Sequence, residues 1–328
     1  MGKRSVFPTG FSTGITVRGL PLSVSHPGEI FFVNNSSVLA KGGVGGADSS
    51  NQSAGSYHRP FRTIDYAIGR CVAGRGDVIL VMPGHAETVS AAAGITLDVN
   101  GVAIIGLGTG DLRPTITFDT IVSAAISWTA DYCTMQNIVF VGNFLSISSA
   151  ILNSGGAGWT IENCTFKDTS AVLGFLACVT TTVGTNSDDG YFADNQRFSD
   201  ATTTPGTALK IANTTKGLKI LRNDFWHTVV ENNIAVVLDH GALVVDKLLM
   251  ADNNIYSINT AQTTEGLLVK TAATTGSGII RYNTVRSNDP SATIMVTATA
   301  VQYGMFENYH VGEAALASGF LLPAAGAD

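Results

Sequence analysis

Short apolar runs recur along the chain, each with an asparagine followed two or three places later by another apolar or aromatic residue. Six of these segments follow one another at an average interval of about 29 residues, and a seventh follows closely. Between them lie runs rich in Val, Ile, Thr and Leu, bounded by small turn residues, such as TALKIAN and EGLLVKTAA. With at least two strand-like runs per interval and no room for a helix, the pattern predicts a repeating coil of β-strands. The seven segments are MQNIVF ending at Phe140, IENCTF at Phe166, ADNQRF at Phe198, LRNDF at Phe225, DNNIY at Tyr256, RYNTV at Val285 and FENY at Tyr309.

The repeat favours an all-β fold, a right-handed parallel β-helix of about eight rungs. Each rung would contain about three strands, and successive rungs would stack about 4.8 Å apart. The asparagines would lie at a corner, because Asn tolerates left-handed backbone and its amide can bond to its equivalents above and below. The aromatic residues after the corner would point inward and stack on one another, namely Phe140, Phe166, Phe198, Phe225 and Tyr256.

An antiparallel sandwich is the alternative fold, in which the spacing of the segments would be accidental. Its strands would be joined by tight hairpins, for which Asn-Gly between alternating runs is the strongest signal. Asn-Gly occurs at Asn100-Gly101 and hardly anywhere else. The pattern therefore favours the β-helix.

One helix is expected, upstream of the main coil, in HRPFRTIDYAIGRCVAGRGD. A glycine-rich exit at Gly74 would end it. Such a helix could cover the open end of a solenoid, which otherwise exposes a sheet edge and apolar core. Its apolar stripe at helical spacing is Ile64, Ala67, Ile68 and Cys71. The chain then divides into an extended N-terminal arm (1–28), a loop and capping helix (29–75), the parallel β-helix (76–310) and an extended C-terminal tail (311–328).

Composition narrows the function classes. Of the 328 residues, 45% are hydrophobic and only 13% are charged, against roughly 25% charged in ordinary domains. The hydrophobic content argues against disorder. The net charge of −6 argues against a nucleic-acid partner, and no apolar stretch approaches the roughly 20 residues that a membrane span needs. We therefore expect a folded protein with few ionisable groups available for chemistry.

The four cysteines, Cys71, Cys133, Cys164 and Cys178, are far apart and contain no CxxC pair. A chain of this length does not need a disulfide framework, so we expect reduced, mostly buried thiols. The first residues are basic but lack the apolar run of a signal peptide. We expect the protein to stay in the cytoplasm where it is made.

The motifs that suggest chemistry each lack a required part. GLGTGDL has Asp111 where a dinucleotide-binding fingerprint needs its third glycine, and His85 with Glu87 has no PCxxC downstream to form a zinc deaminase site. GGVGGAD occurs once, whereas calcium-binding glycine repeats need repetition. Polysaccharide cleavage would need paired carboxyl groups. The candidates are Asp188 with Asp189, Asp239 with His240, and Arg222 with Asp224. None of them is accompanied by further catalytic side chains at matching positions of neighbouring rungs. We therefore assign no catalytic, cofactor-binding or metal-binding residue, and expect no enzyme.

Charge is scarcest in the middle of the chain. Between Arg113 and Glu162 the only ionisable side chains are those of Asp119 and Asp131, if cysteine and tyrosine are left aside. Isolated solenoids normally keep a charged outer wall for solubility. We therefore expect part of the lateral surface to be buried in a homo-oligomer, specifically a trimer.

Four segments resemble a group of tailed-bacteriophage proteins with a pectin-lyase-like right-handed β-helix. They are HRPFRTIDYAIGRC, GDVILVMPGHAETV, AGITLDVNGVAIIGLGTGDLRPTITF and the closing GFLLPAAGAD. The resemblance covers roughly residues 28–175 and the extreme C-terminus, while the middle rungs diverge. It implies a virion component whose gene lies near those for capsid proteins, and it brings no catalytic motif.

The resemblance and the residues together lead to three functional expectations. The first is a capsid decoration or cement protein, assembled in the host cytoplasm as a trimer on the virion shell, with the major capsid protein or other virion proteins as partners. The second is a tail or fibre component that binds a host glycan, for which Trp226-His227 is the best platform because Trp128 and Trp159 are scattered. The third is a tailspike-like depolymerase acting through Asp188 and Asp189 or through Asp239.

Overall fold

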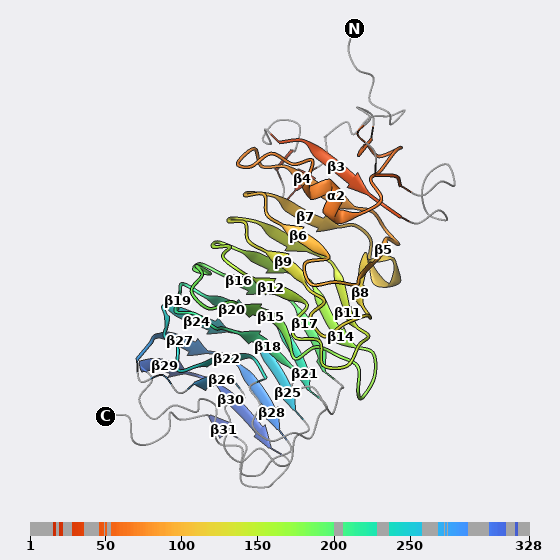
Figure 1. The fold of residues 1–328 in the computed structure, drawn as a ribbon. Coiled ribbons are helices and arrows are strands. Elements are labelled where there is room, and N and C mark those ends of the chain that lie inside the picture. Colours follow the sequence, from red (N-terminus) through yellow and green to blue (C-terminus); the bar gives the residue numbers. More distant parts are fainter. Residues whose placement is uncertain are drawn as a thin grey trace.

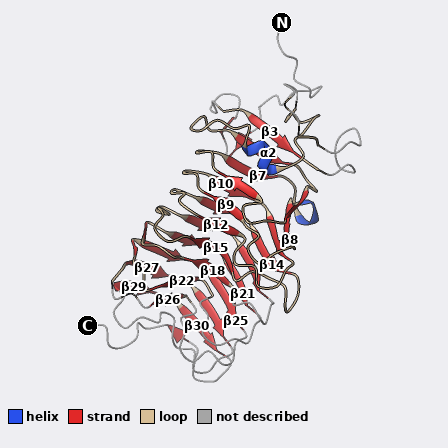
Figure 2. Cartoon of the chain, in the orientation of Figure 1, coloured by secondary structure: helices blue, strands red, loops and turns tan. Residues whose placement is uncertain are grey.

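The computed structural model describes residues 16–17, 20–21, 28–35, 46–48, 50, 54–199, 206–227, 236–257, 268–271, 273, 275–287, 302–312 and 319–320. Within these ranges the chain is a right-handed parallel β-helix, as the repeat predicted (Figure 1). Most of the described turns of the coil contribute one strand to each of three long sheets. Helical structure is confined to the N-terminal part of the described chain (Figure 2).

The three sheets follow one another in the same order in each turn, and are called the first, second and third sheet below. The first sheet contains β3 (Ile30–Val33), β4 (Val78–Val81), β7 (Ala103–Gly106), β10 (Thr134–Gln136), β13 (Thr160–Glu162), β16 (Tyr191–Ala193), β20 (Lys219–Leu221), β24 (Leu248–Ala251), β27 (Ser277–Arg281) and β29 (Gln302–Phe306). The second contains β5 (Ala86–Val89), β8 (Thr115–Phe118), β11 (Val139–Gly142), β14 (Thr165–Asp168), β17 (Gln196–Ser199), β21 (Asp224–His227), β25 (Asn254–Ser257), β28 (Thr284–Ser287), β30 (Tyr309–Gly312) and the antiparallel β31 (Gly319–Phe320). The third contains β6 (Ile95–Leu97), β9 (Ile126–Trp128), β12 (Ile151–Asn153), β15 (Ala177–Thr181), β18 (Thr207–Lys210), β22 (Leu238–Gly241) and β26 (Val269–Thr271).

Smaller elements complete the described chain. A parallel bridge joins β19 (Thr215–Lys216) to β23 (Val245–Asp246) at the edge between the third and first sheets. The short helix η1 (Gly110–Leu112) lies in the turn before β8. The two-stranded pair β1 (Thr16–Val17) and β2 (Leu20–Pro21) falls in the expected N-terminal arm, and β31 falls in the expected C-terminal tail. Most of both segments lies outside the described residues.

A continuous apolar core runs along the coil, because the inward residues of each strand stack on those of the next turn. In the second sheet Phe140 pairs in register with Ile116 on one side and with Phe166 on the other. The rings of Phe140 and Phe166 are stacked with centroids 4.7 Å apart and planes 20° apart, and both side chains are fully buried. Alternation along each strand therefore sends every second side chain into the core.

The predicted asparagine ladder lies at the corner between the first and second sheets. Five consecutive turns contribute one buried asparagine each. The Oδ1 of each accepts the backbone amide of its equivalent in the preceding turn, as Asn253 Oδ1 does from Asn223 N at 3.0 Å. Its Nδ2 donates to a carbonyl of the preceding turn, as from Asn253 to Ile220 O at 2.9 Å. The members are Asn195, Asn223, Asn253, Asn283 and Asn308.

The first two asparagines of the repeat, Asn137 and Asn163, occupy a different place. They have left-handed backbone (φ 58° and 53°) one position before the ladder, where later turns place residues such as Asp194. The ladder position itself is occupied there by Ile138 and Cys164. The asparagine motif therefore marks the same corner in every turn but not the same residue of it.

This offset corrects part of the predicted aromatic stack. The third residue after Asn137 or Asn163 is an inward phenylalanine. The third residue after a ladder asparagine points outward, because a shift of one residue moves a side chain to the other face of the strand. Phe198 and Tyr256 therefore point outward, and Arg197 and Ile255 take the inward positions. Phe225, which lies two residues after its asparagine, is buried as expected.

The expected helix is present as α2 (Ile64–Ile68) and is shorter than the sequence indicated. It ends at Gly69 rather than at Gly74, and the Thr63 hydroxyl accepts the Tyr66 amide at its N-terminus. Its buried face packs against β3, β4 and β6. The carboxylate of Asp65 accepts the amide of Thr96 in β6 (2.8 Å), so the helix covers the open edge of the third sheet. No helix in the described residues has the length and apolar character needed to cross a bilayer.

Replacing Asn253 with alanine should destabilise the fold, because it leaves the Ile220 carbonyl and the Asn223 amide without their partner inside the core. We expect a loss of about 2–3 kcal/mol in the free energy of unfolding, measured by urea denaturation. Asn254→Ala is the matched control, since that adjacent side chain is exposed on the outer face. Equal losses for the two variants would contradict the ladder.

Candidate functional site

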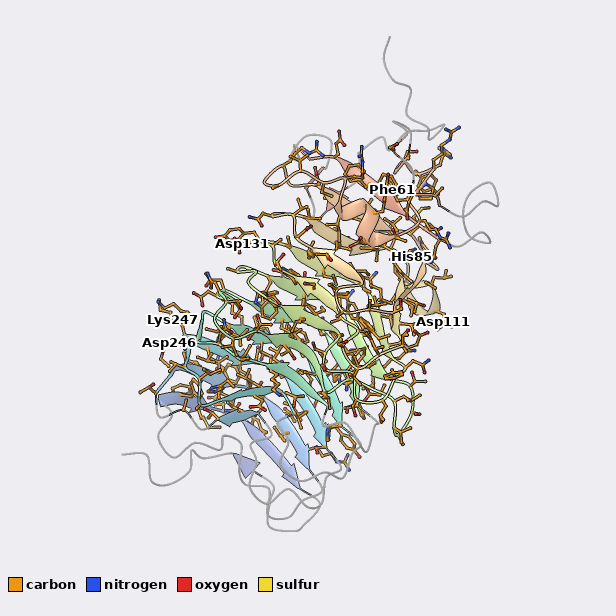
Figure 3. The ribbon with its side chains drawn as sticks, viewed as in Figure 1. Phe61, His85, Asp111, Asp131, Asp246 and Lys247 are labelled. Atoms are coloured by element: carbon orange, nitrogen blue, oxygen red, sulfur yellow. The ribbon has the colours of Figure 1, made fainter. Side chains whose placement is uncertain are left out.

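Asp188 and Asp189 lie in the turn before β16, at the edge between the third and first sheets. Asp188 Oδ1 accepts the backbone amide of Lys216 in the next turn (2.9 Å), and Asp189 has left-handed backbone (φ 56°). Asp131 accepts an amide in the same way two turns earlier, and Figure 3 shows Asp131 and Asp246 along this edge. These carboxylates connect successive turns. The structure gives Asp188 and Asp189 no facing catalytic partner among the described residues.

Asp239 and His240 are adjacent in β22 and therefore lie on opposite faces of the third sheet. Asp239 Oδ1 accepts the Gly241 amide in a local turn (3.1 Å). His240 points into the core, where Nδ1 lies 2.6 Å from the Leu243 carbonyl and Nε2 lies 3.3 Å from the Tyr303 hydroxyl. Burial lowers the pKa of His240. The two side chains do not form an acid–base pair.

Arg222 and Asp224 also fail to pair. Arg222 binds the Asp194 carboxylate of the previous turn, with Nε 2.8 Å and Nη2 2.6 Å from its two oxygens. The Tyr191 hydroxyl lies 3.2 Å from Nη2. Asp224 lies instead at the outer face of the second sheet, beside Asn254. The arginine links two turns at an exposed corner.

His85 and Glu87 form a structural contact near α2. His85 is buried, its Nδ1 accepts the Asn35 amide (3.2 Å), and its Nε2 donates to Glu87 Oε2 (3.0 Å). The same carboxylate oxygen accepts the Ile64 amide at the helix N-terminus (3.0 Å). The pair thus joins β5 to α2, and no group of three or more His, Cys, Asp or Glu side chains in the described ranges could hold a metal ion. Of the GGVGGAD loop only residues 46–48 are described.

The cysteines behave as expected. All four are free thiols, and Cys133, Cys164 and Cys178 are buried. Burial raises the pKa of Cys71, Cys164 and Cys178 to about 12. These thiols therefore stay protonated and unreactive near neutral pH.

A buried ion pair, which the sequence analysis did not predict, joins β14 to β17 in the core. Arg197 occupies the position in register with Phe166 and binds Asp168, with Nη1 2.9 Å and Nη2 3.1 Å from the two carboxylate oxygens. Both side chains are almost completely buried. The guanidinium also donates to the carbonyls of Phe175 and Phe198. This pair is a bidentate contact that fixes the loop after β14 to the core.

His227 lies beside this pair and is 1% exposed. Neither ring nitrogen has a hydrogen-bond partner among the described residues. It is in register with Ser199 on one side and Ser257 on the other. Because no hydrogen bond joins the imidazole to either serine, the arrangement lacks the nucleophile–base contact of acyl-transfer sites.

Stability should fall as the pH is lowered from 6.5 to 4 because of His227. Its pKa is lowered to about 4, mainly by burial and also by Arg197, while Asp168 opposes the shift. Over this range the unfolded chain binds a proton that the folded chain refuses, which costs about 3 kcal/mol in total. Urea denaturation across this pH range should show that His227→Leu reduces the dependence by about that amount and leaves the part due to His240, whose pKa burial also lowers. An unchanged slope in that variant would contradict the assignment.

An exposed aromatic strip lies on the outer face of the second sheet, and Trp226 is its centre. Phe198, Trp226 and Tyr256 occupy equivalent positions in β17, β21 and β25. Phe198 is 39% exposed and Trp226 is 42% exposed. The ring centroids of Trp226 and Tyr256 are 5.1 Å apart, and the Arg286 guanidinium lies 5.3 Å from the Tyr256 ring centroid. We call these three rings the aromatic strip.

An exposed aliphatic ridge lies on three loops of the N-terminal half of the coil. The three loops follow β8, β11 and β14, where the chain passes from the second to the third sheet (Figure 1). The loops stack on one another, as the bond from the Ser148 amide to the Val122 carbonyl (2.8 Å) shows. The four exposed side chains, between 36% and 49% accessible, are Ile121, Val122, Leu145 and Val172. We call them the aliphatic ridge.

Comparisons with known proteins supply no relative. No family model matches the chain, and no curated protein or solved structure matches it significantly.

Proposed function

We propose that this chain is a structural component of a tailed-bacteriophage virion that decorates and reinforces the capsid as a trimer. The segments HRPFRTIDYAIGRC and GDVILVMPGHAETV resemble such proteins, and the parallel β-helix is the fold that this resemblance implied.

The aliphatic ridge is the observation that carries the proposal. A contiguous apolar surface rimmed by polar residues is typical of a protein–protein contact. Three of the four ridge residues, Ile121, Val122 and Leu145, lie between Arg113 and Glu162, where Asp119 and Asp131 are the only charged side chains. The outer face of the adjacent strands continues this surface with Thr115, Thr117, Val139 and Val141.

Such a surface suits permanent assembly. Obligate interfaces are larger and more hydrophobic than transient ones, and their centres are poor in charged residues. The β-helix adds rigidity, since the backbone of each turn is hydrogen-bonded to the turns above and below it. A rigid subunit with a broad uncharged flank can cover the junction between shell subunits without local unfolding.

Sedimentation and a capsid-binding assay test the proposal together. The purified chain should sediment as a species of three 34.1 kDa subunits and should bind empty capsids of its phage in a fixed ratio. Val122→Asp combined with Leu145→Asp should dissociate the trimer or abolish capsid binding, because it places charge in a desolvated contact.

Val183→Asp is the matched control, since Val183 is 83% exposed in a turn away from the ridge. It should leave both the mass and the capsid binding unchanged. A dilute, stable wild-type monomer that ignores capsids would overturn the proposal.

A further inference from the structure

The aromatic strip has no role in the core, and it lies on β17, β21 and β25, beyond the strands β8 and β11 to which the proposed trimer contact extends. On each of its three strands the buried position is filled by a neighbour, Arg197, Phe225 or Ile255, so the outward ring is not needed to complete the interior. Three aromatic side chains in successive turns are left on an outer face. Water contact with so much apolar ring surface is unfavourable unless a ligand covers it.

The spacing of the rings is fixed by the backbone. Strands of neighbouring turns lie about 4.8 Å apart, so the strip presents one ring per turn along the axis of the coil. This interval is close to the length of one sugar unit in an extended glycan chain. Because the ladder of backbone hydrogen bonds holds the strands, the platform is formed before any ligand arrives.

A second column of side chains runs beside the strip, two residues earlier in each strand. It contains Gln196, Asp224, Asn254 and Thr284, which are amides, a carboxylate and a hydroxyl. Gln196, Asn254 and Thr284 are exposed and Asp224 is partly exposed. Donors and acceptors at a fixed distance from an aromatic face are the chemistry that a sugar ring requires, since its C–H groups pack on the rings and its hydroxyls need hydrogen bonds.

We infer that the aromatic strip and the polar column beside it bind an unbranched chain of pyranose sugars that lies along the coil axis. The strip holds the apolar faces of consecutive sugar units, and the polar column holds their hydroxyls. This binding activity goes beyond the structural role proposed above and does not depend on where in the virion the protein lies.

The site binds its glycan without cleaving it. Glycoside hydrolysis needs two carboxyl groups flanking the scissile bond. Among the outward positions of the described strands β14, β17, β21, β25 and β28, Asp224 is the one carboxylate, and its Oδ1 lies 3.4 Å from Asn254 Nδ2. The flanking cations are Lys167 and Arg286.

The location of the tryptophans makes the inference directly measurable. Trp226 is exposed, whereas Trp128 and Trp159, the other two in the chain, are each 1% exposed. Titration of the full chain with cellohexaose, chitohexaose, maltohexaose and bacterial O-chain polysaccharides should shift tryptophan emission to shorter wavelength for at least one probe. The same probe should protect Trp226 from quenching by acrylamide.

Trp226→Ala should weaken binding of that probe at least tenfold in calorimetry. Trp226→Phe should bind within a few-fold of the wild type, because it keeps an aromatic face. Tyr282→Ala is the matched control, since Tyr282 is 46% exposed at the corner between the first and second sheets, and it should change nothing.

Three results would overturn the inference. They are the failure of every probe to bind the wild type, equal affinity of Trp226→Ala and wild type, and a change of oligomeric mass in Trp226→Ala, which would make the strip a contact between copies of the chain. Loss of capsid binding is not among them, so the proposed function is tested separately.

Discussion

Phe225→Arg should abolish stable folding of the β-helix. Phe225 is 1% exposed, and its register partners are Arg197 in the preceding turn and Ile255 in the next. The variant loses the aromatic packing, which is worth about 3–5 kcal/mol. It also places a second guanidinium beside Arg197 in the core, where an unpaired charge costs several kcal/mol more. The sum is comparable with the whole stability of a typical domain.

Trp226→Arg is the control, on the same strand and one residue away. Because Trp226 is 42% exposed, the new guanidinium reaches water, and we expect a loss within about 1 kcal/mol. Circular dichroism and urea denaturation should show a cooperative transition for this variant and none for Phe225→Arg. Similar behaviour of the two would mean that the faces of β21 are assigned the wrong way round.

The contrast between these two neighbours shows what the sequence could and could not predict. The interval of the asparagine segments was enough to predict the parallel β-helix, because the stacking of turns requires equivalent strands to recur once per turn. The position of each asparagine within the corner was not visible. Asn163 and Asn195 read alike in sequence, yet the first has left-handed backbone and the second lies in the buried ladder. That difference of one residue exposed Phe198 and Tyr256.

The same shift hid two features that the structure adds, the aromatic strip and the buried ion pair. The aromatic strip exists because Phe198 and Tyr256 join Trp226 on the outer face, whereas the sequence placed those two rings in the core. The buried ion pair exists because Arg197 takes the vacated inward position. Asn195 stands two residues before Arg197, just as Asn223 stands two residues before the buried Phe225. This spacing indicates an inward Arg197, but only when the strands are aligned in register.

Removing one member of the buried ion pair should be far more damaging than removing both. Arg197→Met removes the counter-ion of the Asp168 carboxylate, which stays in the core and still accepts the Phe175 amide (3.0 Å). We expect a loss of about 3–5 kcal/mol in the free energy of unfolding, since a buried charge without its counter-ion is strongly destabilising. Urea denaturation near neutral pH is the measurement.

The double variant Arg197→Met with Asp168→Leu should recover most of that loss. Both replacements are apolar, and Leu has the branched shape of Asp, so neither charge is left to be desolvated, and such exchanges are often neutral or stabilising. The cycle of single and double variants then gives a coupling energy of several kcal/mol between the two positions. Additive losses would contradict a direct pair. They would mean that Arg197 stabilises the fold mainly through the Phe175 and Phe198 carbonyls and its position 5.9 Å from the Phe175 ring centroid.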